Sequence, residues 1–201
     1  FEVVDGLPKI ADIVQATAED ALACIKAADE AFRNSDWQRT TWAQRAVCLT
    51  NLAERMCAKK DKLAGLIMLE IAKTKKDAYA EVDRTIEFIE ATVIEMHSQA
   101  ERETHLYEID GATYEERYIK AKGPTIVLAS SNYPLNETFT TLISALAVGN
   151  TVVAKAARQG NLVLLELLED FKDCFPSGVV NIFAGHRETV KTLADSQKAK
   201  I

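Results

Sequence analysis

Two short polar clusters in the sequence are placed where they could bind a ligand. Asn132 and Tyr133 follow an apolar run that ends at Ala129, and Lys155 opens a second cluster, directly after the apolar run 151–154. The segment between the two runs has the composition of a helix. A strand–helix–strand unit brings the carboxyl ends of its strands to one edge of a sheet, where such folds bind ligands. The clusters therefore predict a binding site at that edge.

Cysteines and histidines do not form a pattern that predicts other site chemistry. The four cysteines include no CxxC pair and have no metal-type spacing with the three histidines, so we expect no metal site. No cysteine has the His-rich or Gly-rich neighbourhood that activates a thiol nucleophile. Because free thiols are typical of a reducing compartment, we expect a cytoplasmic protein.

The composition excludes two further classes of function. Hydrophobic residues make up 48% of the 201-residue chain, which is ample for a core. The net charge of −6, without a basic block, argues against a nucleic-acid partner. No apolar run approaches the ~20 residues of a membrane-spanning helix. No secretory pattern follows Phe1. We therefore expect neither a membrane nor a nucleic-acid partner.

Helical periodicity dominates the first half of the chain. Thr17 to Asp20 predicts an N-cap with acid in the first turn of a helix that runs to about Arg33. The expected apolar face of this helix consists of Leu22, Ile25, Ala28 and Phe32. Three more amphipathic helices are expected over about 41–56, 63–71 and 75–97. Before all of these, residues 1–16 read as a strand or an irregular arm.

The period changes at residues 102–121, which divide the chain into three parts. Alternating polarity around Asp110-Gly111 predicts a β-hairpin. Such a hairpin either pairs with another subunit or forms a solvent-facing flap. It separates a helical part, 1–101, from a βαβ part, 122–201. In the last part we expect strands over 125–129, 151–154 and 179–183, and helices over 136–148, 161–173 and 188–195.

Motifs along most of the chain, from about Ile10 to Ile201, resemble those of the aldehyde dehydrogenase superfamily. They are Trp37, Arg45, Glu70-Ile-Ala-Lys73, Glu81-Val-Asp-Arg84, Asn132-Tyr-Pro134, Gly149-Asn150, Lys155 and Pro176-Ser-Gly-Val-Val-Asn181. Within that superfamily, Glu70 to Lys73, Asn132 to Asn136 and Gln159-Gly160 resemble the NADP-dependent, non-phosphorylating glyceraldehyde-3-phosphate dehydrogenases. The resemblance implies an α/β fold with a Rossmann-type parallel sheet, flanking helices and an inserted oligomerisation hairpin.

The resemblance also implies an activity. It is the NADP-dependent oxidation of glyceraldehyde 3-phosphate to 3-phosphoglycerate by a homo-oligomer, a dimer or a tetramer. The chain matches only the N-terminal part of family members, whose nucleophilic Cys, general-base Glu and pyrophosphate-binding turn lie beyond the position of Ile201. We therefore expect the chain to be inactive alone. The alternatives are another aldehyde or semialdehyde dehydrogenase, and a module that only binds nucleotide or pairs with a subunit.

Three residues match the substrate side of the family's site. Asn132 corresponds to the asparagine whose amide stabilises an oxyanion; the alternative is an asparagine that only satisfies its own turn. Arg84 and Tyr133 correspond to contacts with the substrate phosphate. The alternative for Arg84 is an ion pair within its helix, with Glu81 or Glu87.

Four residues match the cofactor side. Leu128 corresponds to a cofactor-binding residue, and Lys155 corresponds to the lysine that bonds the adenosine ribose. Arg158 stands where NAD-preferring relatives often have a glutamate. A guanidinium there suits the 2′-phosphate of NADP, although NAD remains possible. The alternative is a solvated basic pair. Arg187 either assists the phosphate or crowds the pocket, because relatives usually have glycine at this position.

The sequence departs from the family pattern in two loops. Ser130-Ser131 replaces a proline and an aromatic residue ahead of Asn132, and Ala156-Ala157 replaces a proline-containing pair after Lys155. Both departures predict less rigid loops around the expected site.

Overall fold

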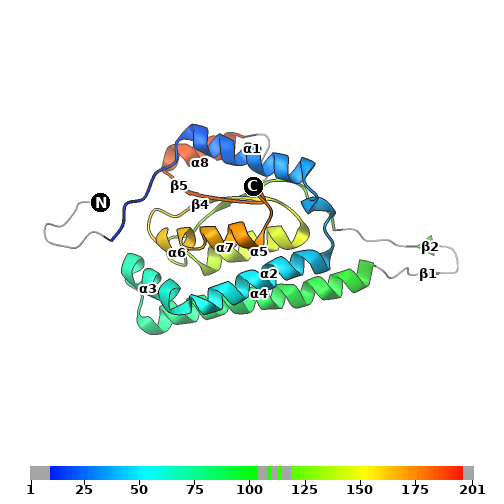
Figure 1. Cartoon of the computed structure of the whole chain (residues 1–201), viewed down its shortest axis with the longest axis horizontal. Coiled ribbons are helices and arrows are strands. Elements are labelled where there is room, and N and C mark those ends of the chain that lie inside the picture. The colour runs from blue at the N-terminus through cyan, green and yellow to red at the C-terminus, as the bar shows by residue number, and fades with distance from the viewer. Residues whose placement is uncertain (1–9, 104–107, 110–112, 115–118, 197–201) are drawn as a thin grey trace.

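Helices and a parallel sheet stack in layers (Figure 1). This computed structural model describes residues 10–103, 108–109, 113–114 and 119–196. The helices of the first half are α1 (Ala18–Asn34), the 3-10 helix η1 (Trp37–Arg39), α2 (Trp42–Ala58), α3 (Lys60–Ile71) and α4 (Lys75–Glu103). Those of the second half are α5 (Asn136–Val148), α6 (Leu162–Leu165), α7 (Leu168–Cys174) and α8 (Arg187–Asp195). The strands are β1 (Glu108–Ile109), β2 (Thr113–Tyr114), β3 (Thr125–Leu128), β4 (Val152–Ala156) and β5 (Val180–Ala184).

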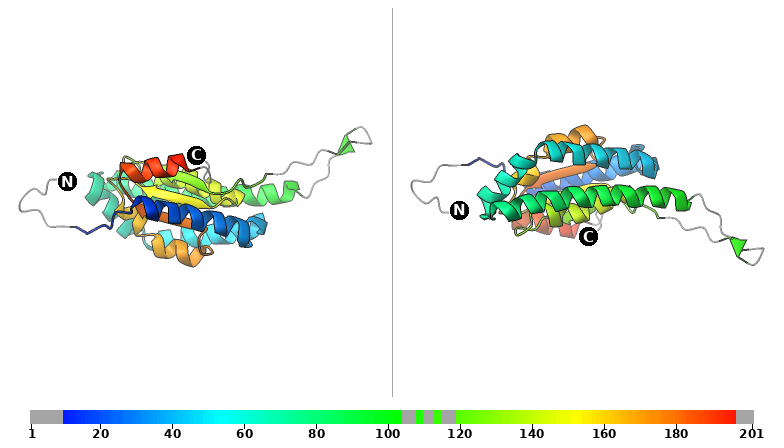
Figure 2. Two further views of the ribbon diagram at one scale, coloured as in Figure 1. Left: turned by 90° about the horizontal axis from the view of Figure 1, so that it is seen from above. Right: turned by 90° about the horizontal axis from the view of Figure 1, so that it is seen from below.

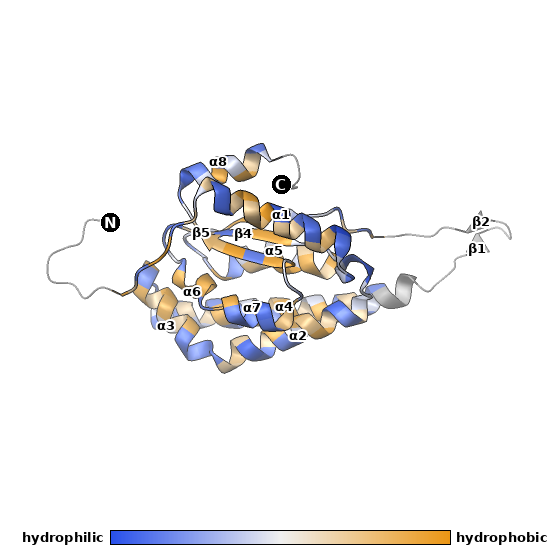
Figure 3. Cartoon of the chain, turned by 45° about the horizontal axis from the view of Figure 1, so that its top comes forward, coloured by the Kyte–Doolittle hydropathy of each residue, from blue (hydrophilic) through white to orange (hydrophobic). Residues whose placement is uncertain are grey.

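The described part of the chain forms a parallel sheet with strand order β3-β4-β5, which confirms the expected α/β class. Helices α1 and α8 cover one face of the sheet, and α5, α6 and α7 cover the other (Figures 1 and 2). Helices α2, α3 and α4 form a further layer outside α5 to α7. The strands are predominantly apolar, as Figure 3 shows, because helices bury both faces of the sheet.

Helix α1 begins as expected, but one residue assigned to its apolar face is exposed. Thr17 and Asp20 form a capping box, in which each side chain accepts a hydrogen bond from the other residue's backbone N–H. Leu22 is 50% exposed, so its assignment to the apolar face is wrong. Ile25 and Ala28 are buried as predicted, and Ala21 completes the buried face in place of Leu22. The two small alanines allow α1 to pack closely on β4 and β5.

Two helices differ in extent from the predictions. Helix α4 continues past His97 to Glu103, six residues further than its apolar stripe indicates. The single helix expected over 161–173 is two shorter helices, α6 and α7. At the break Leu167 enters the core, while Glu166 pairs with Lys59, which lies between α2 and α3, and with Lys62 of α3. The break therefore allows tertiary contacts, which the periodicity of apolar residues cannot predict.

Residues of the sequence motifs at Trp37, Arg45 and Gly149-Asn150 fix the carboxyl end of α5. Gly149 adopts the left-handed conformation, with φ +96°, that ends the helix. The Trp37 indole donates to the Asn150 carbonyl at 3.0 Å, and the Arg45 Nε donates to the Ala147 carbonyl at 2.8 Å. The Asn150 carboxamide oxygen accepts the backbone N–H of Gly123 at 3.1 Å, just before β3. These motif residues therefore have a structural role.

The regions before α1 and after α4 are described in part. Ala16 forms a parallel bridge with Gly185, so the segment before α1 reaches the sheet. Strands β1 and β2 pair antiparallel, whereas the predicted turn at Asp110-Gly111 lies outside the described residues. All four cysteines are free thiols. None of the described helices combines the length and the apolar character needed to cross a membrane.

Candidate functional site

The carboxyl ends of the three parallel strands lie along one edge of the sheet, where the sequence predicts the site. Leu128, Lys155 and Phe183 are aligned across this edge by the strand register. Asn132 and Tyr133 follow β3, Arg158 follows β4 and Arg187 follows β5. Arg84 reaches the site from α4. The fold thus brings the substrate-side residues to one strand end and the cofactor-side residues mainly to its neighbours.

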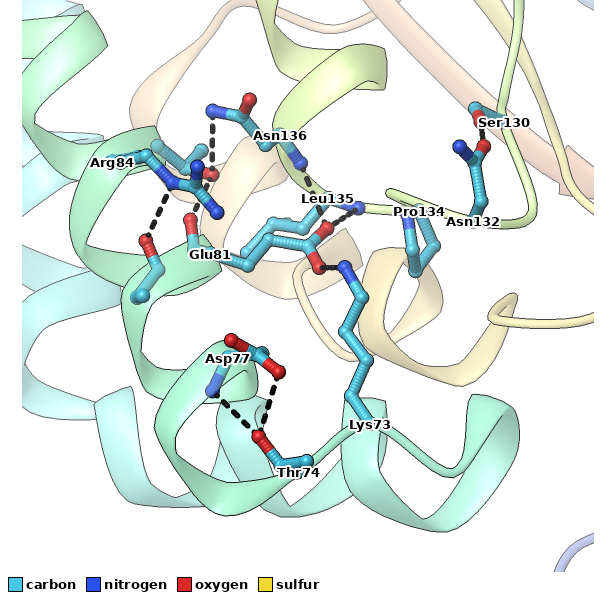
Figure 4. Close-up of polar contacts among 12 residues, drawn as sticks. Lys73, Thr74, Asp77, Glu81, Arg84, Ser130, Asn132, Pro134, Leu135 and Asn136 are labelled. Atoms are coloured by element: carbon cyan, nitrogen blue, oxygen red, sulfur yellow. Dashed lines mark hydrogen bonds and ion pairs between the residues drawn. The ribbon is translucent and has the colours of Figure 1, made fainter.

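A buried carboxylate on α4 anchors the loop that follows β3. The side chain of Glu81 is fully buried, and its Oε1 accepts the backbone N–H groups of Leu135 at 3.0 Å and Asn136 at 3.2 Å. Its Oε2 lies 2.5 Å from the Lys73 Nζ. Figure 4 shows this contact as a dashed line. A carboxylate suits this position because the first N–H groups of α5 have no partner within the helix. Glu81 therefore holds the loop that carries Asn132 and Tyr133.

Two cations lie near the ring of Tyr133. The Lys73 Nζ is 3.4 Å from the ring centroid, and the Arg84 Cζ is 5.7 Å from it. The Arg84 Nε donates to the Ala80 carbonyl at 3.1 Å. The ion pair of Arg84 with Glu81 is not formed, because Glu81 bonds Lys73 instead. Among the described residues Arg84 has no acidic partner, and it can therefore bind an anion beside the phenol.

Asn132 is exposed on the same loop, and its amide is held by a neighbour. The Ser130 hydroxyl donates to the Asn132 Oδ1, while the Nδ2 has no hydrogen-bond partner among the described residues (Figure 4). The alternative role of Asn132, in which its side chain only satisfies the hydrogen bonds of its own turn, therefore applies to the carboxamide oxygen and not to the nitrogen. The two amide N–H groups point away from this bond. They can stabilise negative charge on a ligand oxygen.

A second carboxylate anchors the loop that follows β4. The Glu70 Oε1 accepts the backbone N–H of Asn161 at 3.1 Å, and the Oε2 accepts that of Leu162 at 2.8 Å. Burial raises the pKa of Glu70, and these hydrogen bonds oppose the rise. Gly160 has φ +79°, and a Cβ there would lie 2.6 Å from the Pro134 Cβ. The loops after β3 and β4 are therefore in direct contact.

Three cations on the cofactor side fit an anionic nucleotide. Lys155 is partly buried, and this burial lowers its pKa. Arg158 is exposed, and Arg187 is the exposed first residue of α8. Within the described ranges none of the three forms an ion pair, so their charge is available to a ligand. The Leu128 side chain is 52% exposed beside Lys155 and offers an apolar surface.

The sequence contained Glu70, Lys73 and Glu81 as motif residues but indicated no role for them. For Glu81 one signal was present, because it lies three and four residues from Ala78 and Thr85, on the buried face of α4. An acidic residue on such a face needs a partner. No comparable signal marked Glu70, whose partners are 91 and 92 residues away along the chain. The described residues contain no group of three or more potential metal ligands.

Known proteins share both sequence and fold with this chain. A model of the aldehyde dehydrogenase family matches residues 7–201. The malonate-semialdehyde dehydrogenase of Bacillus pumilus is 30% identical over 196 residues, which are 95% of this chain and 39% of that protein. The chain thus spans about two fifths of the length of this relative.

Solved structures agree with the sequence match. A glyceraldehyde-3-phosphate dehydrogenase, GapN of Methanocaldococcus jannaschii complexed with NADP, superposes with a TM-score of 0.82 at 22% identity, covering 96% of this chain and 42% of that one. An NAD-dependent aldehyde dehydrogenase from Sinorhizobium meliloti gives the same TM-score and identity, with coverage of 92% and 37%. Because the family model covers nearly the whole sequence, the chain belongs to the aldehyde dehydrogenase family.

Proposed function

We propose that this chain forms the substrate- and cofactor-positioning part of an NADP-dependent aldehyde dehydrogenase for glyceraldehyde 3-phosphate. The observation that carries this proposal is the Arg84 guanidinium beside the Tyr133 ring, without an acidic partner in the described part of the chain. Phosphate binding needs a cation, and a phenol adds a directional donor. Lys73 increases the positive charge beside the ring, although Glu81 neutralises part of it.

The loop after β3 would supply a second function, stabilisation of the oxyanion. A thiolate that attacks the aldehyde carbon places negative charge on the aldehyde oxygen, and the Asn132 amide would donate a hydrogen bond to it. The thiolate would come from the remainder of a longer polypeptide. In the overall reaction the aldehyde carbon loses a hydride and gains an oxygen from water. NADP, when bound, accepts the hydride.

The cofactor side would favour NADP through charge. Lys155 would bond the ribose next to Leu128, and Arg158 would bind the 2′-phosphate in a fork. Arg187 would contribute positive charge from the start of α8. Support comes from the exposure of both arginines and from the NADP in the similar GapN structure. The similar NAD-dependent structure makes NAD the competing cofactor.

A second candidate substrate is a semialdehyde that carries a carboxylate. A guanidinium such as Arg84 binds carboxylate as well as phosphate. The relative from Bacillus pumilus, whose name specifies malonate semialdehyde, favours this alternative. A module that binds nucleotide without catalysis is the remaining candidate.

An assay of the intact protein that carries this chain separates these candidates. The values of kcat/KM would be measured with NADP for glyceraldehyde 3-phosphate, glyceraldehyde and malonate semialdehyde. We expect the highest value for glyceraldehyde 3-phosphate. A higher value for malonate semialdehyde would support the second candidate. Nucleotide binding without turnover of any of the three aldehydes would leave only the non-catalytic module.

A further inference from the structure

The loop after β3 contains a serine, Ser130, whose side chain acts on the neighbouring asparagine. We propose that Ser130 is a positioning residue that fixes the orientation of the Asn132 carboxamide, so that its NH₂ group and not its oxygen faces the substrate. This inference rests on the proposed oxyanion role of Asn132. It assigns a specific task to a residue that the sequence pattern marks only as a departure from the family.

A carboxamide needs a positioning hydrogen bond because its oxygen and its NH₂ group are similar in shape but opposite in hydrogen-bonding function. A half turn about the Cβ–Cγ bond exchanges an acceptor oxygen with a donor NH₂ group. Asn132 is exposed, so packing does not select one orientation. If the oxygen faced the substrate it would repel an oxyanion. A hydroxyl that donates to the Oδ1 makes one orientation preferred.

The structure supplies this hydroxyl from a well-anchored backbone. Ser130 follows Ala129, whose N–H donates to the Lys155 carbonyl at 3.0 Å, so the serine is attached directly to the sheet. Its hydroxyl donates to the Asn132 Oδ1. On the far side of the loop, Glu81 holds the backbone of Leu135. The loop is thus fixed at both ends.

A hydrogen bond in the opposite direction, from Asn132 to Ser130, predicts the opposite effect on kcat. If the Asn132 Nδ2 donated to the Ser130 hydroxyl oxygen, the bond would compete for the donor that the oxyanion needs. Removal of the hydroxyl would then raise kcat. If the hydroxyl orients the amide, its removal lowers kcat. The sign of the change therefore distinguishes the two arrangements.

The test compares Ser130→Ala and Ser130→Thr in the intact protein, with Ser131→Ala as the matched control on the exposed neighbour. A neutral hydrogen bond of ordinary strength predicts that Ser130→Ala lowers kcat by about 3- to 10-fold, with little change in KM. Ser130→Thr keeps the hydroxyl and should restore most of the rate. Ser131→Ala should behave like the unmodified protein, and circular dichroism checks that each variant is folded.

A double-variant cycle with Asn132→Ala separates this inference from the function on which it rests. Asn132→Ala alone should lower kcat by roughly 100- to 1,000-fold. Ser130→Ala should then cause no further loss, because the serine acts through the asparagine. An equal loss from Ser130→Ala with and without Asn132, or a rise in kcat, would overturn the positioning role only. An unchanged kcat in Asn132→Ala would overturn the oxyanion role itself, and the inference with it.

Discussion

At the scale of single residues, the candidate site contains cations that have no acidic partner among the described residues. Arg84 faces Tyr133, while Arg158 and Arg187 are exposed at the carboxyl edge of the sheet. Their sequence positions were sufficient to predict where they lie. For Arg84, the absence of an ion pair with Glu81 depends on tertiary structure, because Glu81 is committed to Lys73.

Arg158 decides the choice of cofactor in this account. We predict that Arg158→Glu shifts the ratio of kcat/KM for NADP over NAD toward NAD, because a carboxylate repels the 2′-phosphate. Lys172→Glu, on the exposed side of α7, makes the same change in net charge and should leave the ratio unchanged. Steady-state kinetics with both cofactors measures the ratio. An identical response in the two variants would remove Arg158 from the cofactor site.

If Lys155 binds the cofactor as we propose, it gives cofactor affinity a characteristic pH dependence. Burial lowers the pKa of Lys155, so it loses its positive charge at a lower pH than an exposed lysine. As the pH rises, affinity for NADP should therefore fall earlier than in Lys155→Arg, which keeps its charge. Fluorescence titration of NADP at several values between about pH 7 and 10 tests this. Parallel curves for the two proteins would contradict it.

At the scale of elements, two glutamates of α3 and α4 anchor the loops that follow β3 and β4. Glu81 of α4 holds the start of α5, and Glu70 of α3 holds the start of α6. Each accepts two backbone N–H groups that the helix leaves unpaired. The contact of Gly160 with Pro134 joins the two loops. The adjacent α3 and α4 therefore set the positions of both halves of the site.

The buried Glu81 should contribute strongly to stability. Glu81→Ala leaves the Lys73 charge and two backbone N–H groups without their partner, and we expect a fall of about 3–5 kcal/mol in the free energy of unfolding. Urea denaturation measures it. Glu87→Ala, an exposed position on α4, should change the value by no more than about 0.5 kcal/mol. Similar effects of the two substitutions would show that Glu81 does not anchor the loop.

The elements could be predicted from the sequence where local signals determine them. Apolar runs and helix caps located β3, β4, β5 and the start of α1 to within one or two residues. On α1, Leu22 was wrongly assigned to the buried face because it is apolar, whereas the sheet accepts the smaller Ala21. The break between α6 and α7 follows from contacts with distant helices. The local periodicity of apolar residues cannot predict such contacts.

At the scale of the whole molecule, Glu70 makes stability depend on pH. Burial raises the pKa of Glu70 in the folded chain above its ordinary value of 4.5, so the folded state binds a proton more tightly than the unfolded state. The stabilisation from this proton is complete below the unfolded pKa and is lost as the pH rises through the folded pKa.

Comparison of the unmodified protein with Glu70→Gln tests this dependence. Gln at this position does not titrate, so its free energy of unfolding lacks the contribution of Glu70. From about pH 4 upward, through the folded pKa, we expect the unmodified protein to lose stability relative to the variant. Denaturation curves at several pH values give the difference. A constant difference, or one of the opposite sign, would contradict the assignment.

Assembly of the molecule remains a prediction. The antiparallel pair β1 and β2 lies between α4 and the sheet in the sequence, where the family resemblance implies a subunit contact. We expect the intact protein to form a homo-oligomer in the cytoplasm. Because the chain spans 39% of the length of a curated relative, the complete site includes groups outside this chain in our proposal. In the same proposal, the half of the site that this chain builds would bind and orient the ligands.

The measurement that tests the central proposal most directly is the effect of Arg84→Leu on two substrates of the intact protein. Loss of a charge-assisted bond to phosphate should raise KM for glyceraldehyde 3-phosphate by about 10- to 100-fold. KM for unphosphorylated glyceraldehyde should stay unchanged, and Lys76→Leu, an exposed cation earlier on α4, should alter neither value. An equal rise for both aldehydes, or no rise for either, would contradict a phosphate site at Arg84.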